Sequence, residues 1–233
     1  MYLAIDIGNS RAKAGFFEHD TLVRKEDVAH AQLSAFLRKH ANLKTIVCDV
    51  SGKLEDDELT QLYHFKSDTT VPFTVSYQNI KTLGSDRLAA VYGAWALYPG
   101  KDVLIIDAGT AITFEVLDHQ KGYLGGAISP GVDMRLKALH NFTGKLPLVA
   151  KSNDWGDLGK STEESIRSGV MNGALDEMEG FITRYKRKYP EITVLICGGD
   201  CNLFERRLKP PIFALPDLVL YGLYEALRHS FKV

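Results

Sequence analysis

Two short segments of the chain combine a carboxylate, a glycine and a small polar residue, which are residue types suited to binding phosphate. The first runs from Asp6 to Ser10 and is followed by Lys13, and the second runs from Asp107 to Ala111. A glycine lets the backbone turn sharply and present N–H groups to phosphate, and the carboxylate can hold the accompanying cation. One such turn is weak evidence, because Asp-x-Gly is common in ordinary turns. Two copies predict a duplicated nucleotide-binding core.

Each of these turns lies between two apolar runs that we expect to be strands. Met1–Asp6 precedes the first turn and Ala12–Phe17 follows it, while Val103–Asp107 and Ile112–Leu117 flank the second. The other strands are expected at Lys44–Val50, Pro72–Ser76, Tyr123–Ile128 and Ile192–Cys197, and the helices at Gln32–His40, Leu54–Phe65, Ser85–Leu97, Met134–Phe142, Thr162–Tyr189 and Leu218–Phe231. Hairpin strands followed by strand–helix alternation, given twice, predict two α/β domains with mixed sheets. Ligands in such sheets bind beyond the carboxyl ends of the strands.

The composition is that of an ordinary globular protein. Its 28 basic and 29 acidic residues are nearly balanced, so there is no charge footprint for nucleic acid or an anionic membrane. No apolar run is long enough to span a membrane, and the chain begins directly on a strand without a signal sequence, so we expect a cytoplasmic protein. Three cysteines, at positions 48, 197 and 201, fit a reducing compartment, and we interpret them as inert thiols rather than zinc ligands.

The tetrad Gly84-Ser85-Asp86-Arg87 has two interpretations. In phosphoryl transfer the enzyme mainly positions the acceptor and neutralises charge, so Asp86 could align a hydroxyl group and take its proton. Arg87 offers a fork of donors suited to a carboxylate or phosphate. Alternatively, Ser85 caps a helix, Asp86 lies in its first turn and Arg87 makes a surface ion pair. On the tetrad alone, the helix start is the better interpretation.

Six motifs, in order along the chain, together resemble those of the type III pantothenate kinase family. They are Asp6–Ser10 with Lys13, Leu83–Arg87, Asp107–Ala111, Gly125–Gly131, Ser161–Gly169 and Gly198–Asp200. This family is similar to the acetate kinase, sugar kinase and actin superfamily. The resemblance implies two actin-like (ribonuclease H-like) domains, residues 1–100 and 101–233, with mixed β-sheets flanked by helices and the closing helix packed back on the first domain. It also implies phosphorylation of pantothenate by Mg-ATP, dependence on a monovalent cation (K⁺ or NH₄⁺), and a homodimer.

The resemblance also assigns roles to individual residues. Asp86 corresponds to the catalytic base, Asp107 to the ligand of the monovalent cation, and Thr162 to a residue that reaches substrate across the dimer interface. ATP-binding positions are Asp6, Ile7, Gly8, Asn9, Ser10, Arg11, Ala12, Lys13 and Thr110, and substrate-binding positions are Tyr77, Gly84, Ser85, Asp86, Arg87 and Thr162. Each has an ordinary structural alternative: a hairpin turn, a strand-end carboxylate, an aromatic residue at a strand end, or, for Thr162, a helix cap.

Two positions depart from the family pattern, and two other functions stay open. Glu115 stands where the family commonly has Asp, which bears on the cation site, and Ile80 stands where proline is usual. Gly198 and Gly199 follow a predicted strand and either admit adenine or ribose to the backbone or form a plain loop. The alternatives to a pantothenate kinase are a non-catalytic nucleotide-binding regulatory module and a kinase for another small hydroxyl substrate. No Gly-x-x-x-x-Gly-Lys-Ser/Thr loop is present, which argues against a P-loop kinase.

Overall fold

The computed structural model describes residues 1–54, 62–209 and 211–230. The chain groups into two compact units. Unit 1 consists of Met1–Gly100, Leu117–Gly125 and Asp217–Val233, and unit 2 of Lys101–Val116 and Gly126–Pro216. Among the described residues, no helix is both long enough and apolar enough to cross a membrane.

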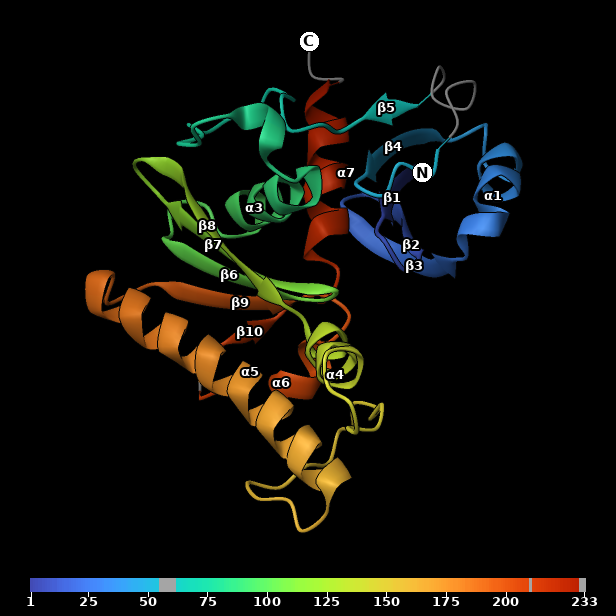
Figure 1. Cartoon of the computed structure of the whole chain (residues 1–233). Coiled ribbons are helices and arrows are strands. Elements are labelled where there is room, and N and C mark those ends of the chain that lie inside the picture. Colours follow the sequence, from blue (N-terminus) through green and yellow to red (C-terminus); the bar gives the residue numbers. More distant parts are fainter. Residues whose placement is uncertain (55–61, 210, 231–233) are drawn as a thin grey trace. The chain divides into compact units, whose positions relative to one another are not determined.

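Unit 1 is built on a five-stranded mixed sheet (Figure 1). Its strands are β1 (Tyr2–Ile7), β2 (Ala12–Glu18), β3 (Thr21–Val28), β4 (Lys44–Asp49) and β5 (Tyr63–His64), in the order β3-β2-β1-β4-β5. Strand β1 is antiparallel to β2 and parallel to β4. The β2–β3 turn has positive φ at both His19 (46°) and Asp20 (67°), which matches the twist of a tight hairpin.

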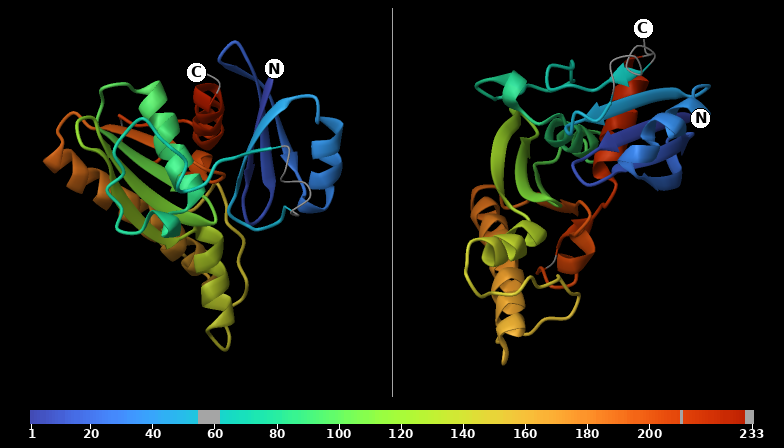
Figure 2. Two further views of the ribbon diagram at one scale, coloured as in Figure 1. Left: turned by 90° about the horizontal axis from the view of Figure 1, so that it is seen from above. Right: turned by 45° about the vertical axis from the view of Figure 1, so that its right-hand side comes forward.

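Alternation along β1 gives the first sheet two different faces. Leu3, Ile5 and Ile7 lie on one face, in a buried cluster with side chains of α1 (Leu33–Lys39), which follows the 3-10 turn η1 (His30–Gln32). Asp6 alternates onto the opposite face. Helix α7 (Leu218–Ser230) contacts β1, β2 and β4, and its Tyr224 stacks on Phe17 with ring centroids 4.3 Å apart. Figure 2 shows α1 and α7 on opposite sides of this sheet.

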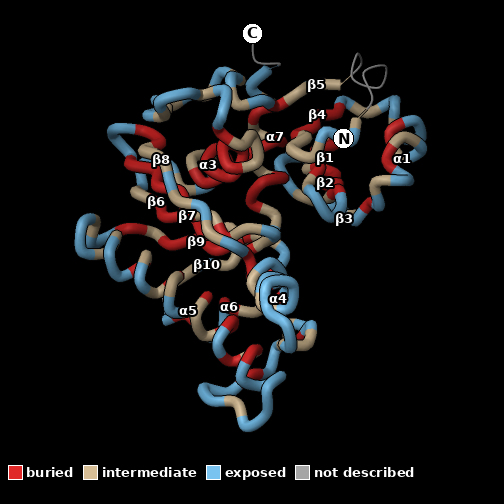
Figure 3. Tube along the Cα trace, viewed as in Figure 1, coloured by how far each residue is buried: buried red, intermediate tan, exposed pale blue. Residues whose placement is uncertain are grey.

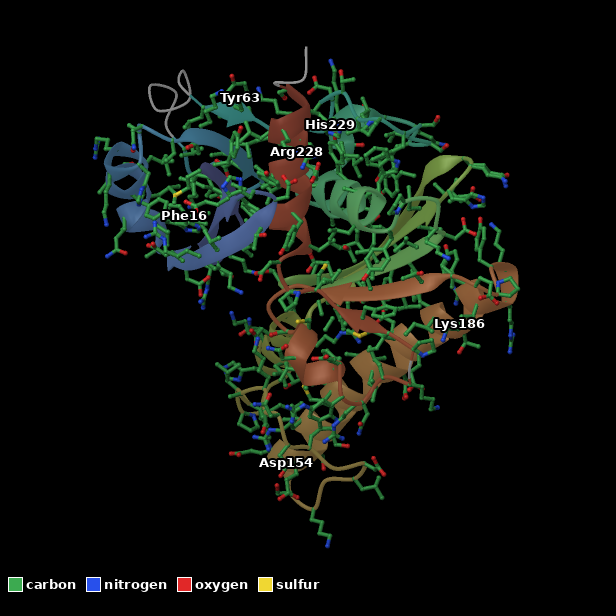
Figure 4. The ribbon with its side chains drawn as sticks, turned by 180° about the vertical axis from the view of Figure 1, so that it is seen from behind. Phe16, Tyr63, Asp154, Lys186, Arg228 and His229 are labelled. Carbon is green, nitrogen blue, oxygen red and sulfur yellow. The ribbon has the colours of Figure 1, made fainter. Side chains whose placement is uncertain are left out.

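Helices α3 (Ser85–Leu97) and α7 lie side by side in unit 1 and approach each other closely. A Cβ atom on Gly93 would lie 2.5 Å from the carbonyl oxygen of Leu218, and one on Gly222 would overlap the carbonyl oxygen of Ala89. Glycine at both positions therefore lets the two backbones pack together without side chains between them. Arg228 and His229, near the end of α7, are labelled in Figure 4.

Unit 2 repeats the strand order of the first sheet. Its strands are β6 (Val103–Ala108), β7 (Ala111–Asp118), β8 (Gly122–Pro130), β9 (Thr193–Cys197) and β10 (Phe213–Ala214), in the order β8-β7-β6-β9-β10. The tips of β7 and β8, within residues 117–125, group with unit 1. Strand β9 is parallel to β6 and to β10. Three consecutive strands, a parallel fourth and a short fifth thus occur twice, which confirms the predicted α/β fold with a duplicated core.

The helices of unit 2 are α4 (Val132–Asn141), α5 (Thr162–Lys188) and the short α6 (Cys201–Phe204). Helix α5 packs on the sheet through Phe181, whose ring stacks on Phe114 of β7 at 3.8 Å between centroids. Helix α4 contacts α5. Residues 142–161, which join these two helices, form no helix or strand. Figure 3 shows much of this segment exposed.

Several elements differ from the sequence-based expectations. Strand β3, strand β10 and α6 were not predicted, because β3 is highly charged and the other two are very short. The predicted strand Pro72–Ser76 is wrong: only Val75 forms a bridge, to Tyr123. The predicted helix Leu54–Phe65 falls largely outside the described residues, and its end is wrong, since Tyr63–His64 is a strand.

Candidate functional site

Asp6 lies in a row of three residues that crosses the first sheet. It is paired with Lys13 on antiparallel β2 and with Cys48 on parallel β4. Side chains of directly paired residues lie on the same face of a sheet, so the carboxylate, the ammonium group and the thiol share the face opposite α1. This row lies close to the carboxyl end of β1, where ligands bind in sheets of this type.

Cys48 connects this row to the start of α3. Its Sγ lies 3.2 Å from Oγ of Ser85, the first residue of the helix. Burial and the nearby Asp6 carboxylate, together with Asp86, raise the pKa of the Cys48 thiol well above its usual value. The thiol therefore stays neutral between two carboxylates. Sequence reasoning interpreted Cys48 as an inert thiol and did not place it at the site.

The tetrad at the start of α3 has a physical explanation in unit 1. The N-cap position is Gly84, not Ser85 as expected, and Asp86 turns back so that its Oδ1 accepts the Arg87 N–H at 2.8 Å. A Cβ atom on Gly84 would lie 2.6 Å from that oxygen, so glycine leaves room for the carboxylate. Burial raises the pKa of Asp86, although its hydrogen bond with Arg87 and the charge of Arg87 act in the opposite direction.

Arg87 is buried between two tyrosines. Its Nη1 lies 3.5 Å from the Tyr77 hydroxyl and its Nη2 lies 3.3 Å from the Tyr123 hydroxyl. The rings of Tyr77 and Tyr123 are nearly parallel, at 8°, with centroids 6.5 Å apart. The structure thus brings together Tyr77 and Arg87, as expected, and adds Tyr123. Sequence reasoning missed Tyr123, because its contact with residues 74–77 is long-range and leaves no local signal.

The first phosphate turn presents backbone and small side chains rather than a cluster of charges. Gly8 does not adopt a left-handed conformation, and a Cβ there would make an ordinary 3.5 Å contact with the Arg11 carbonyl oxygen. The sharp turn therefore does not require glycine. Nε2 of His30 lies 2.9 Å from the Gly8 carbonyl oxygen and braces the turn. Asn9 and Ser10 are exposed at its tip.

Three other residues of this segment are oriented away from the turn or into the core. Ile7 and Ala12 are fully buried, so they can act on a ligand only through their backbone atoms. Arg11 is exposed and pairs with Asp27 at 2.8 Å. Of the predicted ATP-binding side chains between residues 6 and 13, Asp6 and Lys13 are paired on neighbouring strands, and Asn9 and Ser10 reach solvent.

In unit 2, the Asp107 turn is in contact with the Gly198 turn. Asp107 is paired with Cys197 where β6 and β9 end. Gly198 has φ of 89°, and a Cβ there would overlap both the Asp107 carboxylate and the Ala108 carbonyl oxygen. The Asp200 N–H donates to that same carbonyl oxygen at 2.8 Å. The two glycine-containing turns predicted from sequence therefore meet at one edge of the second sheet.

The start of α4 and one lysine complete this edge. The Gly131 N–H donates to the Thr110 carbonyl oxygen at 3.2 Å, and a Cβ on Gly131 would overlap that oxygen. Nζ of Lys151 lies 2.9 Å from Asp133 of α4 and 2.6 Å from Asp200. This lysine ties the 142–161 segment to the turns. Thr110 is exposed, so its hydroxyl can reach a ligand.

Thr162 is the first residue of α5 and is not its cap. Ser161 caps the helix by accepting the Glu164 N–H at 3.2 Å, which leaves the exposed Thr162 hydroxyl outside the capping arrangement. Thr162 lines a groove of about 1100 Å³ between α4 and α5. Leu139, Phe142 and Ile166 line the same groove, and Phe142 is 88% exposed.

Comparison with known proteins connects these features to one family. The sequence model of type III pantothenate kinase matches residues 2–184. A protein of Bacteroides fragilis named type III pantothenate kinase is 44% identical, and the alignment covers 99% of this chain and 98% of the relative. The chain belongs to the type III pantothenate kinase family.

Solved structures support the fold of this family member. A protein of Campylobacter jejuni named as a Baf family transcriptional activator has a TM-score of 0.65 at 22% identity and covers 99% of this chain and 100% of its own. A 2-dehydro-3-deoxygalactonokinase protein from Sinorhizobium meliloti has a TM-score of 0.58 at 13% identity, with full coverage of both chains. At these sequence identities the similarities are evidence for the fold only, and the fold agrees with a duplicated actin-like architecture.

Glu115, which the sequence analysis connects with the cation site, lies in the middle of β7, away from the turns. It is fully buried, and a Cβ on Gly126 of β8 would overlap its carboxylate. Glu115 therefore occupies space that only a glycine on the neighbouring strand leaves open. Ile80 begins the 3-10 turn η2 (Ile80–Thr82), which Asn79 caps by accepting the Lys81 N–H at 3.2 Å.

Proposed function

We propose that this kinase transfers the γ-phosphoryl group of ATP to the primary hydroxyl of pantothenate and so catalyses the first step of coenzyme A biosynthesis. The observation that carries the proposal is the start of α3. There a carboxylate with a raised pKa stands next to a buried guanidinium that contacts two phenols. The Asp86 carboxylate suits the hydroxyl group that is phosphorylated, and the Arg87 guanidinium suits the carboxylate of pantothenate. ATP as the phosphoryl donor is consistent with a cytoplasmic enzyme.

Asp86 is the proposed base. The hydroxyl oxygen of pantothenate attacks the γ-phosphorus, the bond to the β-phosphate oxygen breaks, ADP leaves, and the hydroxyl proton passes to Asp86. Because burial raises the pKa of Asp86, its carboxylate is a stronger base than that of a solvated aspartate. The Gly84 contact and the Arg87 N–H fix the position of the carboxylate. Orientation of this kind is the main contribution that a protein makes to phosphoryl transfer.

The first turn provides the proposed contacts for ATP in unit 1. Backbone N–H groups near Asn9 and Ser10 and the side chains of these two residues would bind phosphate oxygens. Lys13 would add positive charge, and Asp6 would orient hydrated Mg²⁺ that arrives with ATP. The cross-strand pairing of Asp6 with Lys13 supports this assignment, because it places both charges at one end of the sheet.

Asp107 is the proposed ligand of a monovalent cation, with Thr110 beside it as a phosphate contact. The donor set fits such an ion, because the Asp107 carboxylate and the Ala108 carbonyl oxygen both lie against Gly198, where a Cβ would fill the space. When bound, K⁺ or NH₄⁺ would reduce the repulsion between this carboxylate and the phosphates. Any other residue at position 198 would place its Cβ against both oxygens, so glycine leaves them room for an ion.

We also propose that the kinase is a homodimer that uses the groove between α4 and α5. The groove combines apolar side chains, among them Leu139, Phe142 and Ile166, with polar ones, and Phe142 is 88% exposed. A second copy of the chain would cover this surface. The free hydroxyl of Thr162 opens onto the same groove, which supports its assignment as a residue that reaches substrate across the interface.

The test is ADP release coupled to a spectrophotometric readout, with Mg-ATP and pantothenate, in potassium and in sodium buffer. We expect pantothenate-dependent turnover that is faster in potassium and lost in Asp86→Asn, while calorimetry shows that the variant still binds ATP. Turnover with another hydroxyl compound but not with pantothenate would identify a different small-molecule kinase. ATP binding without turnover of any acceptor would identify a regulatory module and would refute the proposal.

A further inference from the structure

The buried phenol of Tyr123 is joined to the candidate substrate site by backbone pairing. The Tyr123 N–H donates to the Thr74 carbonyl oxygen, and the Ser76 N–H donates to the Tyr123 carbonyl oxygen, both at 2.8 Å. Val75 and Tyr123 form a parallel bridge. This pairing sets the position of Tyr123 relative to Tyr77, which follows directly after the bridged residues. The backbone positions of the two tyrosines are therefore set by strand pairing and not by Arg87.

A close contact next to Tyr123 further restricts this backbone. Gly122 has φ of 84°, and a Cβ there would lie 2.8 Å from the Thr74 nitrogen and overlap the Thr74 carbonyl oxygen. Only glycine combines this conformation with so close an approach. The segment before β8 is consequently held against residues 74–76 at a short distance. Tyr123 is placed by this contact and is itself fully buried.

The guanidinium of Arg87 lies between the two phenols. Nη1 and Nη2 lie within 3.5 Å and 3.3 Å of the Tyr77 and Tyr123 hydroxyls, so a different nitrogen faces each ring. The guanidinium carbon is 5.9 Å from the centroid of the Tyr77 ring. Contacts at both terminal nitrogens define the orientation of a planar group, because rotation about its stem would break one of them. Arg87 is only 7% exposed, so loss of an acceptor is not compensated by bulk water.

We propose that Tyr123 is a positioning residue that orients the Arg87 guanidinium toward the carboxylate of the substrate and thereby sets selectivity for an acid. This inference rests on the proposed function, in which Arg87 binds the carboxylate of pantothenate. Tyr77 contributes the matching contact but also belongs to the proposed substrate site. The Tyr123 hydroxyl faces the Arg87 guanidinium, so the effect of Tyr123 depends on the charge of the substrate.

The experiment compares Tyr123→Phe with the wild-type kinase on two acceptors: pantothenate and its primary amide analogue, which lacks the negative charge. We expect the KM for pantothenate to rise about tenfold, as for the loss of one hydrogen bond to a charged group. The kcat for pantothenate and the KM for the amide should change less than twofold. The control is Tyr92→Phe, which removes the hydroxyl of another buried tyrosine of unit 1. That hydroxyl lies 2.5 Å from Nδ1 of His229. This control should leave the acid-to-amide ratio unchanged.

A double-mutant cycle separates positioning from stability. In an Arg87→Lys background, Tyr123→Phe should cause no further loss of selectivity, because the planar group that it orients is gone. Equal effects of Tyr123→Phe on acid and amide, or additive effects in the cycle, would overturn the inference. A wild-type protein that turns over pantothenate and its amide equally well would also overturn it. No turnover of pantothenate by the wild-type protein would instead refute the proposed function itself.

Discussion

Gly84→Ala is a substitution that should separate catalysis from folding. Gly84 has φ of −59° and ψ of 129°, a conformation that alanine adopts without strain. The new Cβ would lie 2.6 Å from Oδ1 of Asp86, whereas ordinary contact begins at 3.4 Å. The carboxylate must therefore move by about 0.8 Å, which is close to the 1 Å displacement that can lower a rate about 100-fold.

The effect on stability should be small, since the atom that must move is the end of a side chain and not backbone. The displacement also disturbs the 2.8 Å hydrogen bond from the Arg87 N–H, which helps to hold the carboxylate. We therefore expect kcat to fall by about 100-fold, while the melting temperature changes by no more than a few degrees and ATP affinity is retained.

The assay is the initial rate of ADP release at saturating pantothenate, with thermal unfolding measured on the same preparation. Gly180→Ala is the matched control, because its new Cβ would have no neighbour within 4 Å; it should leave kcat unchanged. A folded Gly84→Ala protein with the wild-type kcat would refute the reasoning. It would show that the position of the Asp86 carboxylate seen here does not limit turnover.

Asp86, Asp49 and two helix glycines provide further tests, based on burial, hydrogen bonding and close backbone packing. The raised pKa of Asp86 should place the acidic limb of the kcat/KM profile above the pH range of an ordinary aspartate. Asp86→Asn should also raise the melting temperature at pH 7, because it removes a buried charge. This gain should disappear below about pH 4, where the carboxyl group is protonated in the unfolded chain as well. Asp49 accepts hydrogen bonds from the backbone N–H groups of four residues, Ser51, Gly52, Lys53 and Leu54, and these bonds lower its pKa in spite of its burial. Asp49→Asn should therefore destabilise the protein by about 1 kcal/mol at pH 7. The difference between wild type and variant in the free energy of unfolding, measured with urea, should narrow as the pH falls through the pKa of Asp49 in the folded protein. Gly222→Ala should destabilise the protein by about 3 kcal/mol, because the new Cβ would overlap the backbone of α3. Gly173→Ala should instead stabilise it by about 0.5–1 kcal/mol, because a Cβ there would meet open space. Equal shifts in melting temperature for the two variants would contradict both predictions.

The duplicated core could be predicted from the sequence because each copy carries its own local signals. Apolar strands flank both Asp-x-Gly turns, and helix α3 begins and ends where its pattern predicts, at Ser85 and Leu97. Strand β3 escaped prediction because it lies at the edge of the sheet and carries Arg24, Lys25 and Glu26, which remove the alternation that marks a strand. Edge strands often carry such charges.

The candidate site could be predicted only in part, because some of its contacts depend on long-range packing. The Gly84–Arg87 tetrad is contiguous, so its motif is visible in the sequence. The contact of Cys48 with Ser85 and that of Tyr123 with Arg87 span 37 and 36 residues. Nothing local to Tyr123 indicates that its phenol faces a guanidinium. The role of Gly84 in making room for a carboxylate likewise depends on how the Asp86 side chain turns back in the folded protein.

The discontinuity of unit 1 has a consequence for the newly made protein. The face of the first sheet that carries Phe17 packs on α7, and Asp20 of the first hairpin accepts the Tyr224 hydroxyl at 2.7 Å and pairs with Arg228 at 2.5 Å. Both partners lie in α7, which follows the whole of unit 2 along the chain. At translation rates of about 5–20 residues per second, residues 101–216 delay their arrival by roughly 6–23 s. Strands β1–β3 must therefore wait for α7, and during that interval their apolar face is available to chaperones.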